Sequence, residues 1–205
     1  DSPGFGTIET VCAGNPFRPS GWLGITCSSG NVTKIDLSGN SLSGSIPPEL
    51  GNLVNLETLN LSNNSLTGSL PVELNNLQAM KTFDVSNNNL SGNVDHIFGS
   101  CSVAPCFPRM GPTYYLGLQH NQFTGPISGL NALARVRIND NQFTGLVPQT
   151  RAIFRGGIMD YGNNEFKCYE RSDEWPGYGC TDTYPSGYFT CFATCFRYNG
   201  FASHE

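Results

Sequence analysis

The side chains best suited to bind a charged ligand lie in the second half of the chain. Arg135 and Arg137 are separated by one residue, and the aromatic Tyr115 precedes them by 20 residues. Guanidinium groups bind carboxylates through paired hydrogen bonds, and they also stack on aromatic rings. This combination is suited to a carboxylate, an anionic sugar or an acidic side chain of a protein partner. The alternative is a solvated surface on which Arg137 pairs internally with Asp140 or Asp160.

Residues that could carry catalysis are scattered along the chain. The three histidines, His96, His120 and His204, lie far apart in the sequence. The chain contains no G-x-S-x-G nucleophile motif and no Gly-rich phosphate-binding loop. Asp36 and Asp84 could approach each other in space, but an open surface does not exclude water as an active site must. The sequence therefore predicts a protein that is not an enzyme and that has no catalytic residues and no cofactor.

The cysteines favour disulfide bonds over a metal site. Cys191 and Cys195 come closest to a metal-binding spacing, but no second pair and no well-placed histidine accompany them. An even number of cysteines in local groups is typical of disulfides formed in an oxidising compartment. The last four allow three pairings, and the sequence does not choose among them. The eight cysteines expected in disulfides are Cys12, Cys27, Cys101, Cys106, Cys168, Cys180, Cys191 and Cys195.

A repeated element must position the candidate binding residues. Asn40, Asn64 and Asn88 are 24 residues apart, and each lies in a frame of the form L-x-x-L-x-L-x-x-N-x-L. The next matching residue, Asn121, follows Asn88 by 33 residues, so that about nine residues are inserted. Shortened or degraded copies of the frame follow, with their asparagines at 141 and 164.

Each frame predicts a short strand followed by a bend. In the second copy Leu59 and Leu61 point inward, whereas Thr58 and Asn60 point outward. One such strand cannot bury its apolar side alone, but stacked copies form a parallel sheet over a continuous core. The asparagine of the frame, which is Asn64 in this copy, is expected to form hydrogen bonds with backbone groups of neighbouring turns that the bend leaves unpaired.

The outward positions of successive strands form columns on the concave face. Neighbouring strands lie about 4.8 Å apart and alternate residues about 7 Å apart, so Tyr115, Arg135 and Arg137 are expected to be neighbours. The first three copies present Ser, Thr, Asn and Asp in these columns. The later copies present the residues that we predict to form a binding surface, which are Tyr115, Gln119, His120, Arg135 and Arg137.

The second half of each unit carries a family resemblance. The stretches LSGSIPPELGNL at 42–53 and LTGSLPVELNNL at 66–77 resemble the plant-type leucine-rich repeat of receptor-kinase ectodomains and polygalacturonase-inhibiting proteins. The segment WLGITC, residues 22–27, resembles the end of that family's N-terminal cap, which implies that Cys12 pairs with Cys27. The resemblance implies a leucine-rich-repeat solenoid. This is a short right-handed superhelix with a parallel sheet on its concave face, few helices, and disulfide-bonded caps at both ends.

Three regions follow from the repeat pattern. Residues 1–31 are expected to form the N-terminal cap, and residues 32–166 hold about six repeats with an insert at about 95–112. Residues 167–205 are rich in cysteine and aromatic residues and match no repeat. Such a segment is expected to act as a C-terminal cap or tail, because the apolar end of the last repeat would otherwise meet water.

Several features favour an extracellular protein. The chain begins with Asp1 rather than Met, which we interpret as a mature secreted form, and no apolar run approaches the ~18 residues of a membrane span. We therefore expect a protein that is secreted, extracellular or attached to the cell surface or cell wall. Asn-x-Ser/Thr sequons predict glycosylation at Asn31, Asn60, Asn63 and Asn89.

Two functions are compatible with these features. The resemblance implies a recognition module whose concave face binds a protein or a cell-wall polysaccharide. The alternative is a self-assembling structural subunit of an extracellular filament or coat. Residues 1–100 carry 3 basic and 8 acidic side chains and residues 101–205 carry 8 of each, which favours head-to-tail contacts between copies. The net charge of −5 argues against nucleic acid as a partner.

Overall fold

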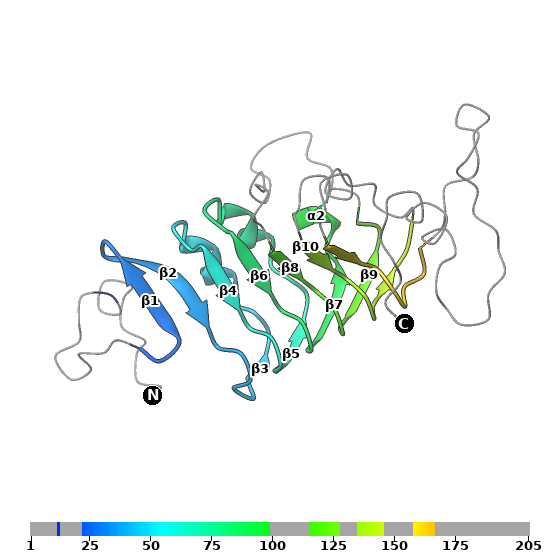
Figure 1. Cartoon of the computed structure of the whole chain (residues 1–205), viewed down its shortest axis with the longest axis horizontal. Helices are drawn as coiled ribbons and strands as arrows, with labels where there is room; N and C mark the ends of the chain where they lie inside the picture. Colours follow the sequence, from blue (N-terminus) through cyan, green and yellow to red (C-terminus); the bar gives the residue numbers. More distant parts are fainter. Residues whose placement is uncertain (1–11, 13–21, 99–114, 128–134, 146–157, 167–205) are drawn as a thin grey trace, which may run out of the picture.

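The protein folds into an array of short strands stacked along one axis. The computed structural model describes residue 12 and residues 22–98, 115–127, 135–145 and 158–166. Strands from successive repeats lie side by side along the long axis of the molecule (Figure 1). The solenoid predicted from the repeats is thus observed, with a parallel sheet and few helices.

The first sheet contains seven strands in the order of the repeats. The strand β1 pairs with β2 in antiparallel fashion, and every later pair in this sheet is parallel. In spatial order the strands are β1 (Ile25–Ser28), β2 (Asn31–Asp36), β4 (Thr58–Asn60), β6 (Thr82–Asp84), β8 (Tyr115–Gly117), β10 (Arg135–Arg137) and β12 (Ile158–Asp160).

A second sheet follows the bend of each repeat. Its spatial order is β11 (Gln142–Phe143), β9 (Gln122–Gly125), β7 (Asn89–Asn93), β5 (Ser65–Gly68) and β3 (Ser43–Gly44). The remaining elements are single turns, namely the 3₁₀ helices η1 (Pro48–Asn52) and η2 (Val72–Asn76) and the α-helix α2 (Asp95–Phe98). A proline stands immediately before each 3₁₀ helix, where its fixed φ and missing N–H are compatible with a helix start.

The strand register confirms the predicted columns of outward residues. The first column consists of Lys34, Thr58, Thr82, Tyr115 and Arg135, and the backbone of Ile158 continues the same register. The second consists of Asp36, Asn60, Asp84, Gly117, Arg137 and Asp160. The strands β6 and β8 pair directly although 33 residues separate Thr82 from its partner Tyr115. Part of the intervening segment, residues 99–114, lies outside the described residues.

The inward residues form one continuous core. Leu59, Phe83, Leu116 and Val136 occupy the same position in successive strands, and all four are fully buried. In the shorter C-terminal repeats, aromatic rings extend the core. The ring centroids of Phe123 and Phe143 lie 6.1 Å apart, as do those of Phe143 and Phe166.

A ladder of asparagine side chains forms hydrogen bonds with the backbone groups at the bends, as predicted from the repeated frame. The Asn121 amide nitrogen donates to the carbonyls of Leu118 and Gln119 in its own repeat, at 3.1 and 3.3 Å. It also donates to the carbonyl of Val85 in the preceding repeat, at 3.0 Å. Its oxygen accepts the N–H of Leu90, also in the preceding repeat, at 3.0 Å. Equivalent bonds are made by Asn64, Asn88, Asn141 and Asn164.

The N-terminal end carries the predicted disulfide between Cys12 and Cys27. The other six predicted disulfide cysteines lie outside the described residues, as does the whole segment 167–205. Among the described residues, no helix has both the length and the apolar composition needed to cross a membrane.

Candidate functional site

The register brings three of the predicted binding residues together. Tyr115 lies opposite Arg135, and Gly117 lies opposite Arg137, in the parallel pair β8 and β10. Both arginine side chains are exposed, and the Tyr115 side chain is half-buried. The concave surface of these two strands therefore presents two guanidinium groups beside an aromatic ring.

The two arginines do not pair with any described carboxylate. The ion pairs among the described residues are Lys34 with Asp36 at 3.2 Å, Lys81 with Glu57 at 2.7 Å, and His120 with Asp140 at 3.3 Å. The alternative pairing of Arg137 with Asp140 or Asp160 is therefore wrong. Asp140 lies instead in the column of His120, because both residues follow the strand ends of their repeats.

Gly117 leaves room for the side chains of its neighbours. A Cβ atom added to Gly117 would lie 2.6 Å from Asp84 Oδ1 and 3.0 Å from Tyr115 Cε1. The Tyr115 hydroxyl lies close enough to the side chains of Gln119 and Asp84 for both to influence its ionisation. Burial, and then the negative charge of Asp84, raise the pKa of Tyr115 above its ordinary value. Tyr115 thus stays neutral at physiological pH and fills the space above the glycine.

In the first three repeats the polar side chains on the concave face form hydrogen bonds with one another. The Ser38 hydroxyl donates to Asp36 Oδ1 at 2.9 Å. In the equivalent bonds of the next two repeats, the Ser62 hydroxyl donates to Asn60 Oδ1 at 2.8 Å and the Ser86 hydroxyl donates to Asp84 Oδ1 at 2.6 Å. The backbone N–H groups of Ser62 and Ser86 donate to the same oxygens. This part of the surface therefore needs no ligand to complete its hydrogen bonds.

The side-chain hydrogen bonds that the first three repeats form have no equivalent at β8 and β10. Gly117 and Arg137 occupy the column that holds the accepting Asp or Asn in the earlier repeats, and neither can accept a side-chain hydrogen bond. The residues that replace the serines are Gln119 and Asn139. Their side-chain oxygens are buried and have no hydrogen-bond partner among the described residues.

Three residues that were not predicted from the sequence lie beside the predicted binding residues. Asp84, Gly117 and Asn139 take part through the contacts above, in addition to the predicted Tyr115 and Gln119. The column alignment contains a signal for them, because position 117 is the first at which an Asp or Asn gives way to glycine.

His120, also a predicted binding residue, lies at the turn that follows its strand. Its φ is +55°, in the left-handed region that Asn, Asp and His tolerate better than most residues, and Asp140 has the same φ. The His120 ring faces Asp140, and the side-chain amides of Asn139 and Asn163 donate to the same carboxylate. His120 thus belongs to a turn cluster at the strand ends rather than to the surface formed by the two arginines.

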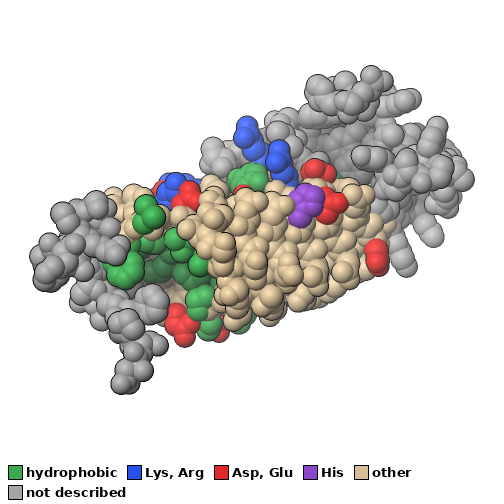
Figure 2. Space-filling view, turned by 90° about the horizontal axis from the view of Figure 1, so that it is seen from below, with side chains coloured by type: hydrophobic (Ala, Val, Ile, Leu, Met, Phe, Trp, Pro, Cys, Tyr) green, Lys and Arg blue, Asp and Glu red, His purple; other side chains and the backbone are tan. Residues whose placement is uncertain are grey.

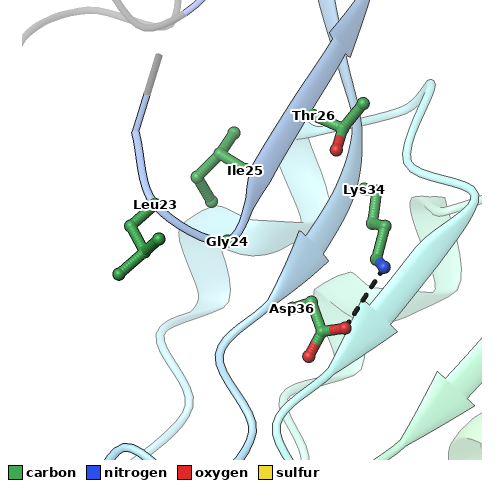
Figure 3. A pocket seen from close by; sticks show the side chains of 6 residues that line it. All are labelled: Leu23, Gly24, Ile25, Thr26, Lys34 and Asp36. Carbon is green, nitrogen blue, oxygen red and sulfur yellow. Dashed lines mark ion pairs between the residues drawn. The ribbon is translucent and has the colours of Figure 1, made fainter. Parts of the chain in front are cut away.

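The surface also has an open hollow at the N-terminal end of the array, with a volume of about 330 Å³ (Figure 3). Residues 23–26 line it together with Lys34 and Asp36. The charges of Lys34 and Asp36 neutralise each other there. A side-chain hydrogen bond from Ser38, and then the contact with Lys34, lower the pKa of Asp36. The hollow therefore offers no unpaired charge to a ligand.

The predicted sequons occupy different environments. Asn31, Asn63 and Asn89 are exposed, whereas Asn60 is half-buried on the concave face. Asn60 Oδ1 accepts bonds from the Ser62 N–H and hydroxyl, at 3.1 and 2.8 Å. Three of the four asparagines thus have side chains open to modification.

The described residues contain no group of three or more His, Cys, Asp or Glu side chains arranged to hold a metal ion. Seen from below (Figure 2), most of the array is covered by uncharged polar side chains and backbone, with small groups of charged side chains. Asp36 and Asp84, on β2 and β6, are separated by the intervening strand β4. These two carboxylates are therefore not on neighbouring strands.

Comparisons with known proteins agree with the architecture. The family described as Leucine Rich repeats (2 copies) matches residues 30–69, and the family described as Leucine Rich Repeat matches residues 79–101. The crystal structure of Pollen Receptor Kinase 3 is 30% identical, with a TM-score of 0.51, and the match covers 71% of this chain and 69% of that chain.

Two further solved structures are similar. The BIR2 ectodomain from Arabidopsis thaliana is 25% identical, with a TM-score of 0.56, and the match covers 80% of this chain and 87% of that chain. PEPR1 in its complex with AtPEP1 is 27% identical, with a TM-score of 0.58, and the match covers 72% of this chain. That match spans only 20% of the PEPR1 chain. The repeat frame, the sheet and these matches together show that the chain belongs to the plant-type leucine-rich repeat proteins.

Proposed function

We propose that this chain is a non-enzymatic extracellular recognition module that binds a protein ligand through the concave surface of β8 and β10. The observation that supports this most is the pair of exposed arginines, Arg135 and Arg137, which have no described carboxylate partner. An unpaired guanidinium pair beside Tyr115 is complementary to an acidic group of a partner. The similarity to receptor ectodomains, among them PEPR1 in complex with AtPEP1, supports a protein ligand.

The first three repeats would serve as a scaffold in this proposal. Their concave serines are already bonded to the Asp or Asn two residues earlier in the same repeat. Binding energy is therefore expected from the later repeats, where polar groups remain unmatched.

A charge-matched pair of variants tests the proposal. Arg135→Gln combined with Arg137→Gln should abolish binding to acidic peptides, measured by fluorescence anisotropy with a peptide library. Lys34→Gln combined with Lys81→Gln changes the net charge equally but removes lysines that are already paired, and it should leave binding within about twofold. If both double variants bind as the wild type does, the site is not at the two arginines.

We also propose that the protein is secreted and glycosylated. Asn31, Asn63 and Asn89 are exposed and favourable for a glycan, whereas Asn60 uses its amide oxygen to hold Ser62. Intact-mass measurement before and after enzymatic removal of N-glycans, on protein purified from its natural source, tests this. An unchanged mass would contradict glycosylation.

Self-assembly into a filament or coat is the second candidate. The whole net charge of −5 falls in residues 1–100, and the unpaired Arg135 and Arg137 would meet those acidic repeats in a head-to-tail contact. Size-exclusion chromatography of the purified protein without a partner separates the two functions. A monomer at micromolar concentration excludes assembly, and a polymer lost in the Arg135→Gln, Arg137→Gln variant supports it.

A further inference from the structure

The two exposed arginines on β10 have neighbours of different charge. The residues in register with Arg135 are Tyr115 on β8 and Ile158 on β12, and neither residue type carries a charge. Arg137 lies in register with Asp160 on β12. The Asp160 side chain is exposed and forms no ion pair with any described residue. Arg137 therefore has an unpaired carboxylate on the adjacent strand, whereas the register partners of Arg135 are uncharged.

A second carboxylate lies on the other side of the same arginine. Asp84 belongs to β6, but its Oδ1 atom lies 2.6 Å from the position that a Cβ atom of Gly117 would occupy. The carboxylate thus extends over β8, the strand that pairs with β10. Burial raises the pKa of Tyr115, the charge of Asp84 raises it further, and the charge of Arg137 lowers it, so both charges act on one hydroxyl. Arg137 is therefore flanked by Asp84 on one side and by Asp160 on the other.

We propose that Asp84 and Asp160 are specificity-determining residues, which restrict the site to a single isolated carboxylate bound at Arg135 and exclude polyanions. This inference rests on the proposed function, in which the concave surface of β8 and β10 binds an acidic group of a protein partner. The partner is then a protein segment with one acidic side chain among uncharged residues. A polyuronic acid, with a carboxylate on every sugar, would bring several of its charges against the two aspartates.

The exclusion follows from the spacing within the sheet. Neighbouring strands lie about 4.8 Å apart, so a second ligand carboxylate that approached Arg137 would come close to both aspartates. Like charges at such short range repel even in salt, because the separation is within about one Debye length. A carboxylate at Arg135 lies about 7 Å further along the strand and meets less of this repulsion. Unfavourable charges placed against the wrong ligand are a common source of specificity.

The charge of Asp84 is not needed for the hydrogen bonds that it makes. Its Oδ1 atom accepts the N–H and the hydroxyl of Ser86, at 3.0 and 2.6 Å. The uncharged Asn60 makes the same pair of bonds at the equivalent position of the second repeat. Asp36, in the same column, is neutralised by Lys34 at 3.2 Å, whereas Asp84 forms no ion pair with any lysine or arginine in the described ranges. The negative charge of Asp84 is therefore left to act on a ligand.

The first test compares peptides with one and two acidic residues. The probe is an N-acetylated, C-amidated octapeptide with a single Glu, selected for binding to the full-length protein. A second Glu is then placed two residues before or after the first, which is the spacing of Arg135 and Arg137. At one of these positions it should weaken binding to the wild type about threefold to tenfold, although it adds a charge near a second arginine. In Asp84→Asn combined with Asp160→Asn, the same Glu should weaken binding less than about twofold.

A charge-matched variant controls for net charge. Glu49→Gln combined with Glu73→Gln also removes two negative charges, but these exposed residues lie on η1 and η2, outside the seven-stranded sheet. The cost of the second Glu should be the same in this control as in the wild type. If the control also removed that cost, net charge alone would explain it and the inference would be overturned. Melting temperatures of both variants verify that they are folded.

The second test uses a polyanion directly. Oligogalacturonate should bind the wild type at least about tenfold more weakly than the single-Glu peptide does. The variant Asp84→Asn, Asp160→Asn should bind oligogalacturonate about threefold to tenfold more tightly than the wild type. Binding of oligogalacturonate that is as tight as that of the peptide in the wild type would overturn the inference.

The outcomes separate this inference from the function on which it rests. If the Arg135→Gln, Arg137→Gln variant loses the single-Glu peptide but a second Glu strengthens binding to the wild type, the proposed function stands and this inference fails. If no single-Glu peptide binds the wild type, the proposed function fails and this inference fails with it. A cost of the second Glu that disappears only in the Asp84→Asn, Asp160→Asn variant supports both.

Discussion

Asp84 on β6 and Gly117 on β8 face each other in register, and a Cβ atom on Gly117 would lie 2.6 Å from Asp84 Oδ1. The carboxylate occupies space that only glycine leaves open, and the Tyr115 ring borders the same space. The absence of a side chain at one residue thus determines how its two neighbours are placed. The first prediction follows from this contact.

Gly117→Ala should destabilise the fold by about 1–3 kcal/mol, because the added methyl group forces the Asp84 carboxylate or the Tyr115 ring to move. Denaturation by urea, followed by circular dichroism, measures the change. Gly162→Ala is the matched control, since a Cβ there would meet its nearest atom at 3.7 Å, and it should cost less than about 0.5 kcal/mol. Equal midpoints for the two variants would contradict the close contact.

Asn121→Ala should destabilise the fold by about 3–5 kcal/mol, because several buried backbone groups of two repeats lose their partners at once. Asn40 is the control. It is exposed, and its amide nitrogen donates to the Ser38 carbonyl of its own turn. Asn40→Ala should therefore cost less than about 1 kcal/mol. Chemical denaturation measures the free energy of unfolding of both variants. Similar losses of this free energy for the two variants would show that the ladder is not a major source of stability.

Phe143→Ala should destabilise the fold by about 3–5 kcal/mol, because the fully buried ring stacks between Phe123 and Phe166 and its loss leaves a cavity. Phe143→Leu keeps most of the volume and should cost less than about 1.5 kcal/mol. Thermal melts of the two variants and the wild type check the order. If the leucine variant lost as much as the alanine variant, the stacking of the rings would matter more than the filled volume.

The stability of the N-terminal repeats should depend on pH through Asp36. The pKa of Asp36 is lowered in the folded protein, chiefly by the hydrogen bond from the Ser38 side chain. The stabilising contribution is thus present above the unfolded-state pKa of about 3.9 and is lost as the pH falls through the folded-state pKa. Asp36→Asn should therefore be less stable than the wild type near pH 6, and the difference in melting temperature should shrink below pH 4.

Asn60 shows that asparagine fits at the equivalent position of the second repeat, with the Ser62 hydrogen bond preserved. The substitution therefore tests charge rather than shape. A difference in melting temperature that does not vary between pH 6 and pH 2 would show that the carboxylate charge contributes nothing.

The period of the asparagines was sufficient to predict the solenoid, the inward residues and the columns. A repeat that stacks in register leaves one way to align Thr58 with Thr82 and Tyr115 with Arg135, so the pattern determines which residues are neighbours. Even the 33-residue spacing before Asn121 did not disturb this alignment, because β6 and β8 still pair directly.

The hydrogen-bond partners within the site could not be predicted in the same way. Asp140 is three residues after Arg137 in the sequence, but the left-handed backbone of the turn places its carboxylate beside His120. The unmatched oxygens of Gln119 and Asn139 depend on side-chain torsions and on which donor each amide meets, and the repeat pattern carries no information on either.

The asparagine ladder gives the array a polarity. Each rung bonds a carbonyl and an N–H of the repeat before it, as Asn64 does with Leu37 and Leu42 and Asn164 does with Ile138 and Phe143. Every repeat is therefore completed by its successor. Removing a repeat from the C-terminal side of the ladder would leave a carbonyl and an N–H of the preceding repeat without the asparagine that bonds them. Removing the first repeat would instead leave the side chain of Asn64 without two of its partners, and it would free the carbonyls of Asn60 and Ser62, which accept the N–H groups of Leu37 and Gly39. The two faces of a repeat are therefore not equivalent, because one is completed by side chains and the other supplies them.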